Sequence, residues 1–259
     1  MQVEKTHEPV FLKNPADRGL VVFIHGFLGS PRQFDELSDV AQQDGYSTAE
    51  LLLPGHGGTA KEFAAGTFER WQAYVDEEVA RFSRDYDNIL LAGHSMGGLL
   101  AINAAVSCPG HVRGILTIAC PFKLTFFSTY AIKIRLKQFF SKKGDPIKAA
   151  YISNCSVKQS PSLLWRVFKP KAELDKLIAS ALDKLPDVDV PVIAVYSSSD
   201  ELTSIESLGI LYSGLTGASF EQVLLSDSLH AYYTEDESEM IKQALRKLMA
   251  RGIMRLEQA

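Results

Sequence analysis

The sequence has no long uninterrupted apolar run. None of its apolar stretches approaches the ~18 residues that a membrane-spanning helix needs. The stretch from Met1 to Gly19 carries three acidic residues and no apolar segment, so it does not resemble a secretory signal. Cysteine is also scarce. The three cysteines form an odd set without the spacing of a metal site, which favours reduced thiols. We therefore expect a cytoplasmic protein.

Positive charge and chain-breaking residues are limited as well. The 27 Lys+Arg and 31 Asp+Glu residues give a net charge of −4, which excludes a global basic surface for nucleic acid. Eighteen Gly and eleven Pro among 259 residues are too few for a low-complexity chain. No phosphate-binding glycine fingerprint, no His-Glu-x-x-His motif and no paired cysteines occur. We accordingly expect neither a cofactor nor a metal ion.

Short apolar strands alternate with helical segments along most of the chain. We predict strands at residues 19–24, 46–53, 88–92, 114–119, 190–197 and 218–225. Helical spacing of apolar residues predicts helices at residues 31–44, 71–82, 99–106, 204–215 and 235–256. This alternation is typical of βαβ units. It predicts an α/β fold, in which helices flank a mostly parallel central sheet.

A segment of different composition interrupts the alternation between residues 121 and 185. It holds 13 Lys+Arg and 4 Asp+Glu, a net charge of +9, which leaves the rest of the chain at −13. It also holds nine of the 25 aromatic residues, namely Phe122, Phe126, Phe127, Tyr130, Phe139, Phe140, Tyr151, Trp165 and Phe168. Its pattern is helical, above all at residues 125–140 and 161–185. We predict that residues 1–120 and 186–259 form the core, and that residues 121–185 form a helical cap over one edge.

The string Gly93-His94-Ser95-Met96-Gly97 matches the G-x-S-x-G pattern between a predicted strand and a predicted helix. A sharp turn between the two would force Ser95 into a strained backbone conformation, which small flanking residues tolerate. The turn would also lift the hydroxyl clear of the sheet. A glycine-rich turn that happens to contain a serine is the alternative. In this context we predict that Ser95 is a nucleophile.

A serine hydroxyl needs a base to take its proton near neutral pH. In this architecture the partners follow in the order serine, acid, histidine. His230 follows the last predicted strand and is the predicted base, and Asp200 follows the strand before it and is the predicted acid. Glu201 and Asp227 are alternatives for the acid. Of the other histidines, we expect His25, His56 and His94 to be structural, whereas His7 and His111 have no motif around them.

The tetrahedral intermediate of acyl transfer needs hydrogen-bond donors for its oxyanion. The residue after the nucleophile, Met96, would supply one backbone N–H group. The loop after the first buried strand would supply the other through Phe27, which follows His25-Gly26. The alternative for this loop is a tight turn with no catalytic role.

With these residues, the chain resembles the α/β-hydrolase superfamily, and most of all its small bacterial carboxylesterases and monoacylglycerol lipases. The likeness runs from about Leu20 to Leu256. It rests on Ile24-His-Gly-Phe27, Leu53-Pro-Gly-His-Gly57, Gly93-His-Ser-Met-Gly-Gly98, Ser199-Asp-Glu201 and Ser228-Leu-His230. The resemblance implies the same catalytic roles for Ser95, Asp200 and His230, the same oxyanion donors, and a lid that shapes an acyl pocket. Leu229 stands where such enzymes often have Gly.

The expected function is hydrolysis of short- or medium-chain acyl esters or monoacylglycerols through an acyl-enzyme on Ser95. Other chemistry on the same triad remains open: a thioesterase, a C–C hydrolase or an acyltransferase. A non-catalytic ligand-binding protein is the alternative from another class. The cap aromatics favour an apolar pocket, although we expect most of them to pack the cap onto the core. The basic charge of the cap suggests a second hypothesis, weak contact with anionic lipid. A solvated basic face is the simpler interpretation.

Overall fold

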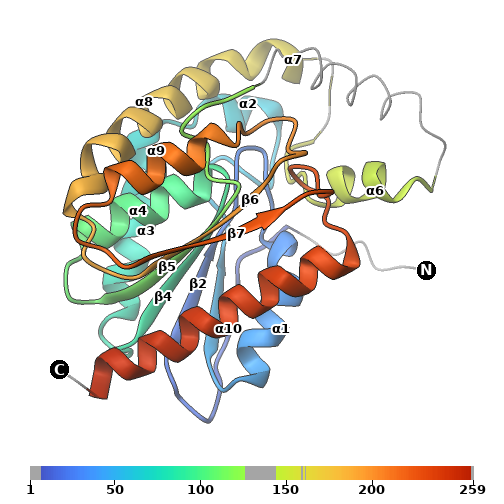
Figure 1. Ribbon diagram of the computed structural model, residues 1–259. Helices are drawn as coiled ribbons and strands as arrows, with labels where there is room; N and C mark the ends of the chain where they lie inside the picture. The colour runs from blue at the N-terminus through green and yellow to red at the C-terminus, as the bar shows by residue number, and fades with distance from the viewer. Residues whose placement is uncertain (1–6, 126–143, 159, 161, 258–259) are drawn as a thin grey trace.

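A seven-stranded sheet forms the centre of the computed structural model, which describes residues 7–125, 144–158, 160 and 162–257 (Figure 1). The strands in chain order are β1 (Val10–Leu12), β2 (Leu20–Ile24), β3 (Ser47–Leu51), β4 (Ile89–His94), β5 (Val112–Ile118), β6 (Val192–Ser197) and β7 (Phe220–Leu225). Their spatial order is β1-β3-β2-β4-β5-β6-β7. Every neighbouring pair is parallel except β1 and β3. The predicted α/β fold with a mostly parallel sheet is therefore confirmed.

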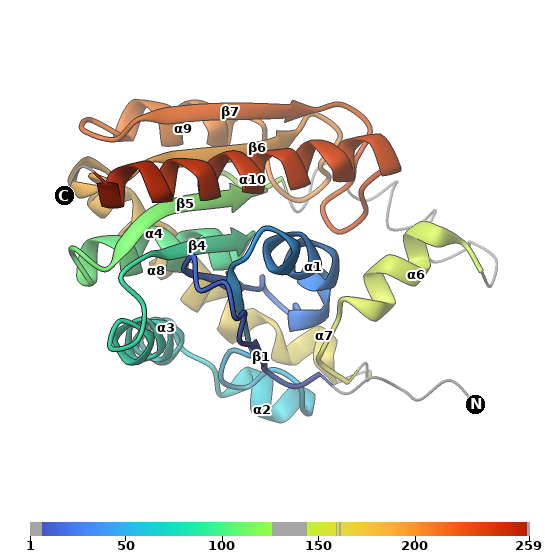
Figure 2. The ribbon, with the colours of Figure 1, turned by 90° about the horizontal axis from the view of Figure 1, so that it is seen from below.

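Helices cover both faces of the sheet. They are α1 (Asp35–Gln43), α2 (Ala60–Ala64), α3 (Phe68–Phe82), α4 (Met96–Ser107), α6 (Pro146–Ser153), α7 (Leu163–Arg166), α8 (Phe168–Lys184), α9 (Glu206–Gly214) and α10 (Glu235–Glu257), with the 3-10 turns η1 (Pro31–Phe34) and η2 (Leu185–Asp187). Helices α1 and α10 pack on one face, and α3, α4, α8 and α9 pack on the other (Figures 1 and 2). Strands β2 and β4 are buried throughout, which explains why they read as continuous apolar runs.

The start of the first helical segment follows its predicted signals. The Ser30 hydroxyl accepts a hydrogen bond from the Arg32 N–H, and Pro31 occupies the first helical position, where no N–H is needed. Beyond the end of α1, Gly45 adopts a φ of +89°, a conformation that side-chain-bearing residues disfavour. Strand β3 begins two residues after this turn.

Strand β1 was not among the predicted strands. It has only three residues, all of them exposed, and it pairs antiparallel with β3 at the rim of the sheet. Phe11 stacks on Phe82 of α3, with 5.5 Å between the ring centroids. A strand this short shows no period-2 alternation, so its pairing depends on the neighbour that the fold provides.

The insertion between β5 and β6 differs in part from its prediction. The predicted helix at 161–185 is two helices, α7 and α8, which meet at Val167; Pro170 lies in the first turn of α8, the place where a helix tolerates proline. Helix α8 buries Leu174 and Leu177 in the same apolar cluster as α4. Most of the predicted helix at 125–140 lies outside the described residues.

The longest helix, α10, is amphipathic. It buries Ile241, Ala244, Leu245 and Leu248 against the sheet and leaves a charged face outside. Within the described ranges, no helix combines the length and the apolar character needed to cross a bilayer.

Candidate active site

Ser95 is the single residue between β4 and α4. Its backbone has φ +53° and ψ −121°, a strained conformation for a residue with a side chain. The flanking glycines are required by close contacts: a Cβ atom on Gly93 would lie 2.3 Å from the Gly97 carbonyl oxygen, and one on Gly97 would lie 1.9 Å from the Ile24 carbonyl oxygen. The predicted sharp strand-to-helix turn is therefore present.

The loop after β2 approaches this turn closely. A Cβ atom on Gly26 would lie 2.9 Å from the Cβ of Ser95. Phe27 follows Gly26 directly, and its ring packs edge-on against the ring of Phe63, with 5.0 Å between the ring centroids. Met96 is the first residue of α4, where a helix provides no acceptor for the backbone N–H. The two segments that carry the predicted oxyanion donors thus meet at Ser95.

Asp200 and His230 form a buried hydrogen-bonded pair. The Nδ1 atom of His230 lies 2.8 Å from Oδ2 and 3.1 Å from Oδ1 of Asp200. Oδ1 also accepts hydrogen bonds from the backbone N–H groups of Leu202 and Thr203, both at 2.8 Å. Burial alone would raise the pKa of Asp200, but the charge and hydrogen bond of His230 and the two amides outweigh it and lower the pKa. Asp200 therefore stays ionised beside the imidazole.

The surroundings of His230 favour its protonated form. Burial of the ring acts to lower the pKa of His230, but the Asp200 carboxylate, with an added contribution from Glu201, raises it above its usual value. The two alternative acids make other contacts and are not hydrogen-bonded to the imidazole ring among the described contacts. A Glu201 oxygen accepts the backbone N–H of His230 at 3.0 Å, and the exposed Asp227 accepts the Ser226 hydroxyl. Of the three carboxylates, only Asp200 is hydrogen-bonded to the imidazole ring among the described contacts.

The backbone carbonyl of His230 is hydrogen-bonded to His94, the residue before Ser95. The His94 Nε2 lies 2.8 Å from the His230 carbonyl oxygen, and the two imidazole rings are 4.9 Å apart between centroids. Burial and the neighbouring His230 lower the pKa of His94 to about 3, so His94 is neutral near pH 7. Within the described residues, no hydrogen bond joins the Ser95 hydroxyl to the His230 ring. Such contacts are often long before a substrate binds.

His25 has the structural role that its position predicted. Its Nδ1 donates to the Gly26 carbonyl at 2.9 Å, and its Nε2 accepts the Leu53 N–H at 3.0 Å, which ties the loop after β2 to the loop after β3. Burial lowers the pKa of His25 to about 4, so the ring is neutral. His56 packs edge-on against His25, with 4.7 Å between centroids.

Glu237 is a contributor to the site that the sequence analysis missed. Its carboxylate accepts backbone N–H groups from Ser226, Asp227 and Ser228, and also the Ser228 hydroxyl. These residues lead from β7 into the loop that carries His230. One carboxylate in the first turn of α10 therefore shapes the loop. No spacing in the sequence signals this contact.

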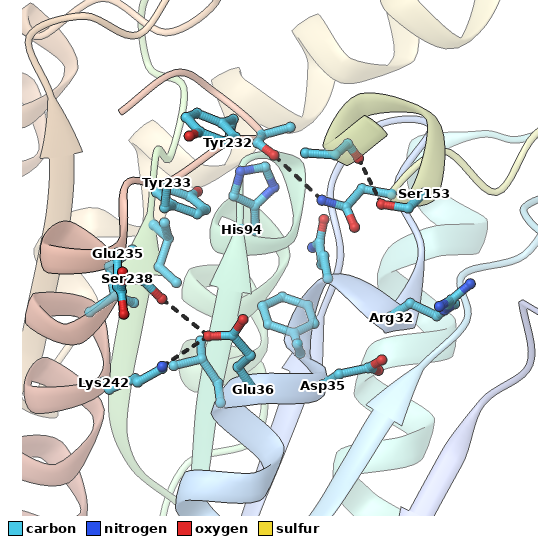
Figure 3. A pocket seen from close by; sticks show the side chains of 18 residues that line it. Arg32, Asp35, Glu36, His94, Ser153, Tyr232, Tyr233, Glu235, Ser238 and Lys242 are labelled. Carbon is cyan, nitrogen blue, oxygen red and sulfur yellow. Dashed lines mark hydrogen bonds and ion pairs between the residues drawn. The ribbon is translucent and has the colours of Figure 1, made fainter. Parts of the chain in front are cut away.

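A pocket of about 850 Å³ lies beside His94, between α1, α10 and α6 (Figure 3). Its wall includes Arg32 and the Glu36–Lys242 ion pair, which bridges α1 and α10 at 2.9 Å. Residues 121–185 contribute Ala150, Ser153 and Asn154 to the lining. None of the four cap aromatics that the structure describes, Phe122, Tyr151, Trp165 and Phe168, is part of it. Ser95 and His230 do not line it either. The lining mixes charged side chains such as Arg32 and Lys242 with apolar ones such as Phe34 and Ile241.

Of the four cap aromatics that the structure describes, two lie on the surface. Trp165 is 78% exposed and Phe168 is 60% exposed, with 6.4 Å between their ring centroids. Phe122 is buried as expected. Five of the nine cap aromatics lie outside the described residues.

Comparison with known proteins identifies the family. The family model described as serine aminopeptidase, S33 (Hydrolase_4) matches residues 15–237. The thermostable monoacylglycerol lipase of Bacillus sp. (strain H-257) is 25% identical over 224 residues, which cover 85% of this chain and 86% of that protein. The carboxylesterase of Bacillus subtilis (strain 168) is 20% identical over 229 residues, which cover 86% of this chain and 89% of that protein.

A solved structure from the study of LipS and LipT, two metagenome-derived lipolytic enzymes, superposes with a TM-score of 0.71 at 24% identity. It covers 95% of this chain and 99% of that one. These matches confirm the superfamily that the sequence motifs predicted. The chain belongs to the Hydrolase_4 family of α/β-hydrolases.

Proposed function

We propose that the protein hydrolyses carboxylic esters, either short- to medium-chain acyl esters or monoacylglycerols, through an acyl-enzyme on Ser95. The observation that carries the proposal is the buried hydrogen-bonded pair of Asp200 and His230. The backbone carbonyl of His230 is in turn hydrogen-bonded to His94, the residue before the strained Ser95. The names of two relatives, a monoacylglycerol lipase and a carboxylesterase, support an ester as the substrate.

The reaction would proceed in two acyl-transfer steps. The Ser95 oxygen attacks the ester carbonyl while His230 accepts the hydroxyl proton, and Asp200 holds the Nδ1–H tautomer and stabilises the imidazolium. The backbone N–H groups of Phe27 and Met96 would bind the oxyanion. His230 then returns the proton to the leaving alcohol. In the second step His230 activates a water molecule, which releases the acid and restores Ser95.

Ser95→Ala tests this proposal. We expect turnover of p-nitrophenyl esters to fall by about 10⁴- to 10⁶-fold, because the nucleophile acts as one unit with its base. Labelling by a fluorophosphonate should disappear with it. The control is Ser213→Ala, which removes an exposed hydroxyl on α9. Comparable turnover in Ser95→Ala and wild-type protein would refute the acyl-enzyme on Ser95.

A substrate panel separates the ester proposal from other chemistry on the same residues. Acyl-CoA thioesters, C–C-cleavage substrates and acyl acceptors other than water would each identify one alternative reaction. A non-catalytic binding protein would bind esters without turnover and without fluorophosphonate labelling. Rates across esters of increasing acyl length, as monomers and as micelles, would define the acyl preference.

For the cap, residues 121–185, we further propose weak contact with anionic lipid. Trp165 and Phe168 are exposed. The exposed cation Arg166 lies between them in the sequence, and the exposed Lys169 follows Phe168, a combination that suits an anionic membrane surface. Co-sedimentation with vesicles of phosphatidylcholine alone or with phosphatidylglycerol, at low and high salt, tests this. We expect binding that needs the anionic lipid, weakens with salt and weakens in Trp165→Ala. Binding indifferent to lipid charge and salt would refute it.

A further inference from the structure

Glu201 is a buried carboxylate beside the proposed acid. Only 2% of its surface is exposed. A carboxylate at such a position is costly unless hydrogen bonds satisfy it. One oxygen accepts the backbone N–H of His230 at 3.0 Å, and the other accepts the hydroxyl of Tyr151. The carboxylate thus joins the loop of the proposed base to a side chain of the cap.

The His230 main chain depends on side chains for its hydrogen bonds. Its N–H is held by Glu201, and its carbonyl is held by His94. A buried backbone N–H without a partner would destabilise the loop. Because the imidazole has to meet both Asp200 and the reacting hydroxyl, the placement of this short loop determines whether the proton can be transferred.

The cap segment from Tyr151 to Ser156 contacts both loops of the site. Tyr151 lies on α6 and binds Glu201. The Asn154 amide donates to the Ala231 carbonyl at 3.5 Å, directly after His230. The Ser156 N–H donates to the Leu28 carbonyl at 3.0 Å, in the loop that carries Phe27. The position of this one segment is therefore linked to the base and to the oxyanion loop together.

We propose that Glu201 is a positioning residue for His230, and that the Tyr151 hydroxyl makes this positioning depend on the seating of α6 on the core. The proposal rests on the ester-hydrolase function given above. Glu201 does not touch the substrate. It holds the main chain of the base, and Tyr151 supplies the donor that its second oxygen needs at this depth of burial.

The charge of Glu201 provides a readout that a purely structural contact would not change. The titratable groups facing His230 are Asp200 and Glu201 from the loop after β6 and His94 from the end of β4, while the hydroxyl of Tyr233 contacts its carbonyl. Both carboxylates raise the pKa of His230. Glu201→Gln keeps the size and one acceptor but removes the charge, so it should lower the pKa of His230.

Steady-state kinetics of three variants test the inference. We expect Glu201→Gln to move the acid limb of kcat/KM to lower pH. Glu201→Ala should lower kcat by about 10- to 100-fold with little change in KM, since the His230 N–H loses a charged acceptor. Tyr151→Phe should lower kcat by about 3- to 10-fold without moving the limb, because the charge remains. The controls are Glu206→Gln, a surface ion-pair residue, and Tyr212→Phe, an exposed tyrosine on α9.

NMR titration of the His230 ring in wild-type and Glu201→Gln protein gives an answer that does not need activity. If the wild-type protein hydrolyses no ester, the proposed function fails, while the titration still tests the positioning role. An unchanged titration in Glu201→Gln, together with wild-type kcat in Tyr151→Phe, would overturn the inference. If Glu201→Ala does not fold, the isosteric Glu201→Gln and Tyr151→Phe decide.

Discussion

The His94 imidazole donates a hydrogen bond to the main-chain carbonyl of His230, with 2.8 Å between Nε2 and oxygen. The residue before the proposed nucleophile therefore holds the proposed base, although 136 positions separate the two histidines. His94→Phe should lower kcat by about 10-fold, because the His230 carbonyl loses the shorter of its two side-chain hydrogen bonds and keeps only the one from Tyr233. Steady-state kinetics check this, with the exposed His111→Ala as control. A wild-type kcat in His94→Phe would mean that this contact does not position the base.

The pH dependence of activity follows from the raised pKa of His230. A base must be neutral to accept a proton, so kcat/KM should fall as the pH decreases through the pKa of His230, with a midpoint above 6.5. His94 and His25, with pKa values of about 3 and 4, are neutral over this range and add no step. A pH–rate profile between pH 5 and pH 9 measures the midpoint. A midpoint below the ordinary histidine value would contradict the influence of Asp200.

Substitution of the acid separates Asp200 from Asp227. Asp200→Asn should lower kcat by about 10⁴-fold, because the amide neither fixes the correct tautomer nor stabilises the imidazolium. Asp227→Asn should keep a kcat within a few-fold of wild type. This residue is exposed, its carboxylate accepts the Ser226 hydroxyl, and its bond to Glu237 comes from the backbone N–H, which the substitution keeps. Burst and steady-state rates on the same ester measure both. Equal losses in the two variants would contradict the assignment of Asp200.

Glu237 should contribute to stability in a pH-dependent way. Burial raises its pKa, but the Ser228 hydroxyl and the amides of residues 226–228 lower the pKa overall. A group with a depressed pKa in the folded state stabilises the protein above its unfolded pKa, and loses that effect as the pH falls through the folded value. Glu237→Gln should therefore lower the unfolding free energy by on the order of 1–2 kcal/mol at pH 7.

Urea unfolding at pH 7 and at pH 3 measures this difference. The gap between wild type and Glu237→Gln should narrow at the lower pH. Glu239→Gln, on the exposed side of α10, serves as the control. A gap that is constant with pH would show that the carboxylate charge is not the stabilising feature.

The parts of the fold that the sequence predicted are those with strong local signals. Strands β2 and β4 are buried on both faces and therefore appear as unbroken apolar runs. The turn at Ser95 is set by glycines whose missing Cβ atoms are needed locally, so a short pattern was enough to find it. Asp200 and His230 were placed from the order of strands and loops, and the structure brings them into contact.

The missed features depend on partners that are distant in sequence. Strand β1 forms only because β3 offers an edge to pair with. The sequence offers Glu201 as an alternative acid, but its carboxylate accepts the His230 backbone N–H and the Tyr151 hydroxyl, contacts that have no sequence signature. The exposure of Trp165 and Phe168 likewise has no signature in the aromatic composition of the segment. Local pattern thus predicts the candidate reacting groups, and tertiary geometry determines which side chains contact them.

The conformation at Ser95 sets a limit on how this protein can gain heat resistance. Glycine adopts a positive φ with the least strain, but glycine at this position would remove the oxygen that we propose as the nucleophile. Selection for thermal stability alone would thus act against the proposed nucleophile at this position. Durable variants that still turn over substrate have to obtain their extra stability elsewhere, for instance at surface charges and helix ends, where substitutions leave the serine turn untouched.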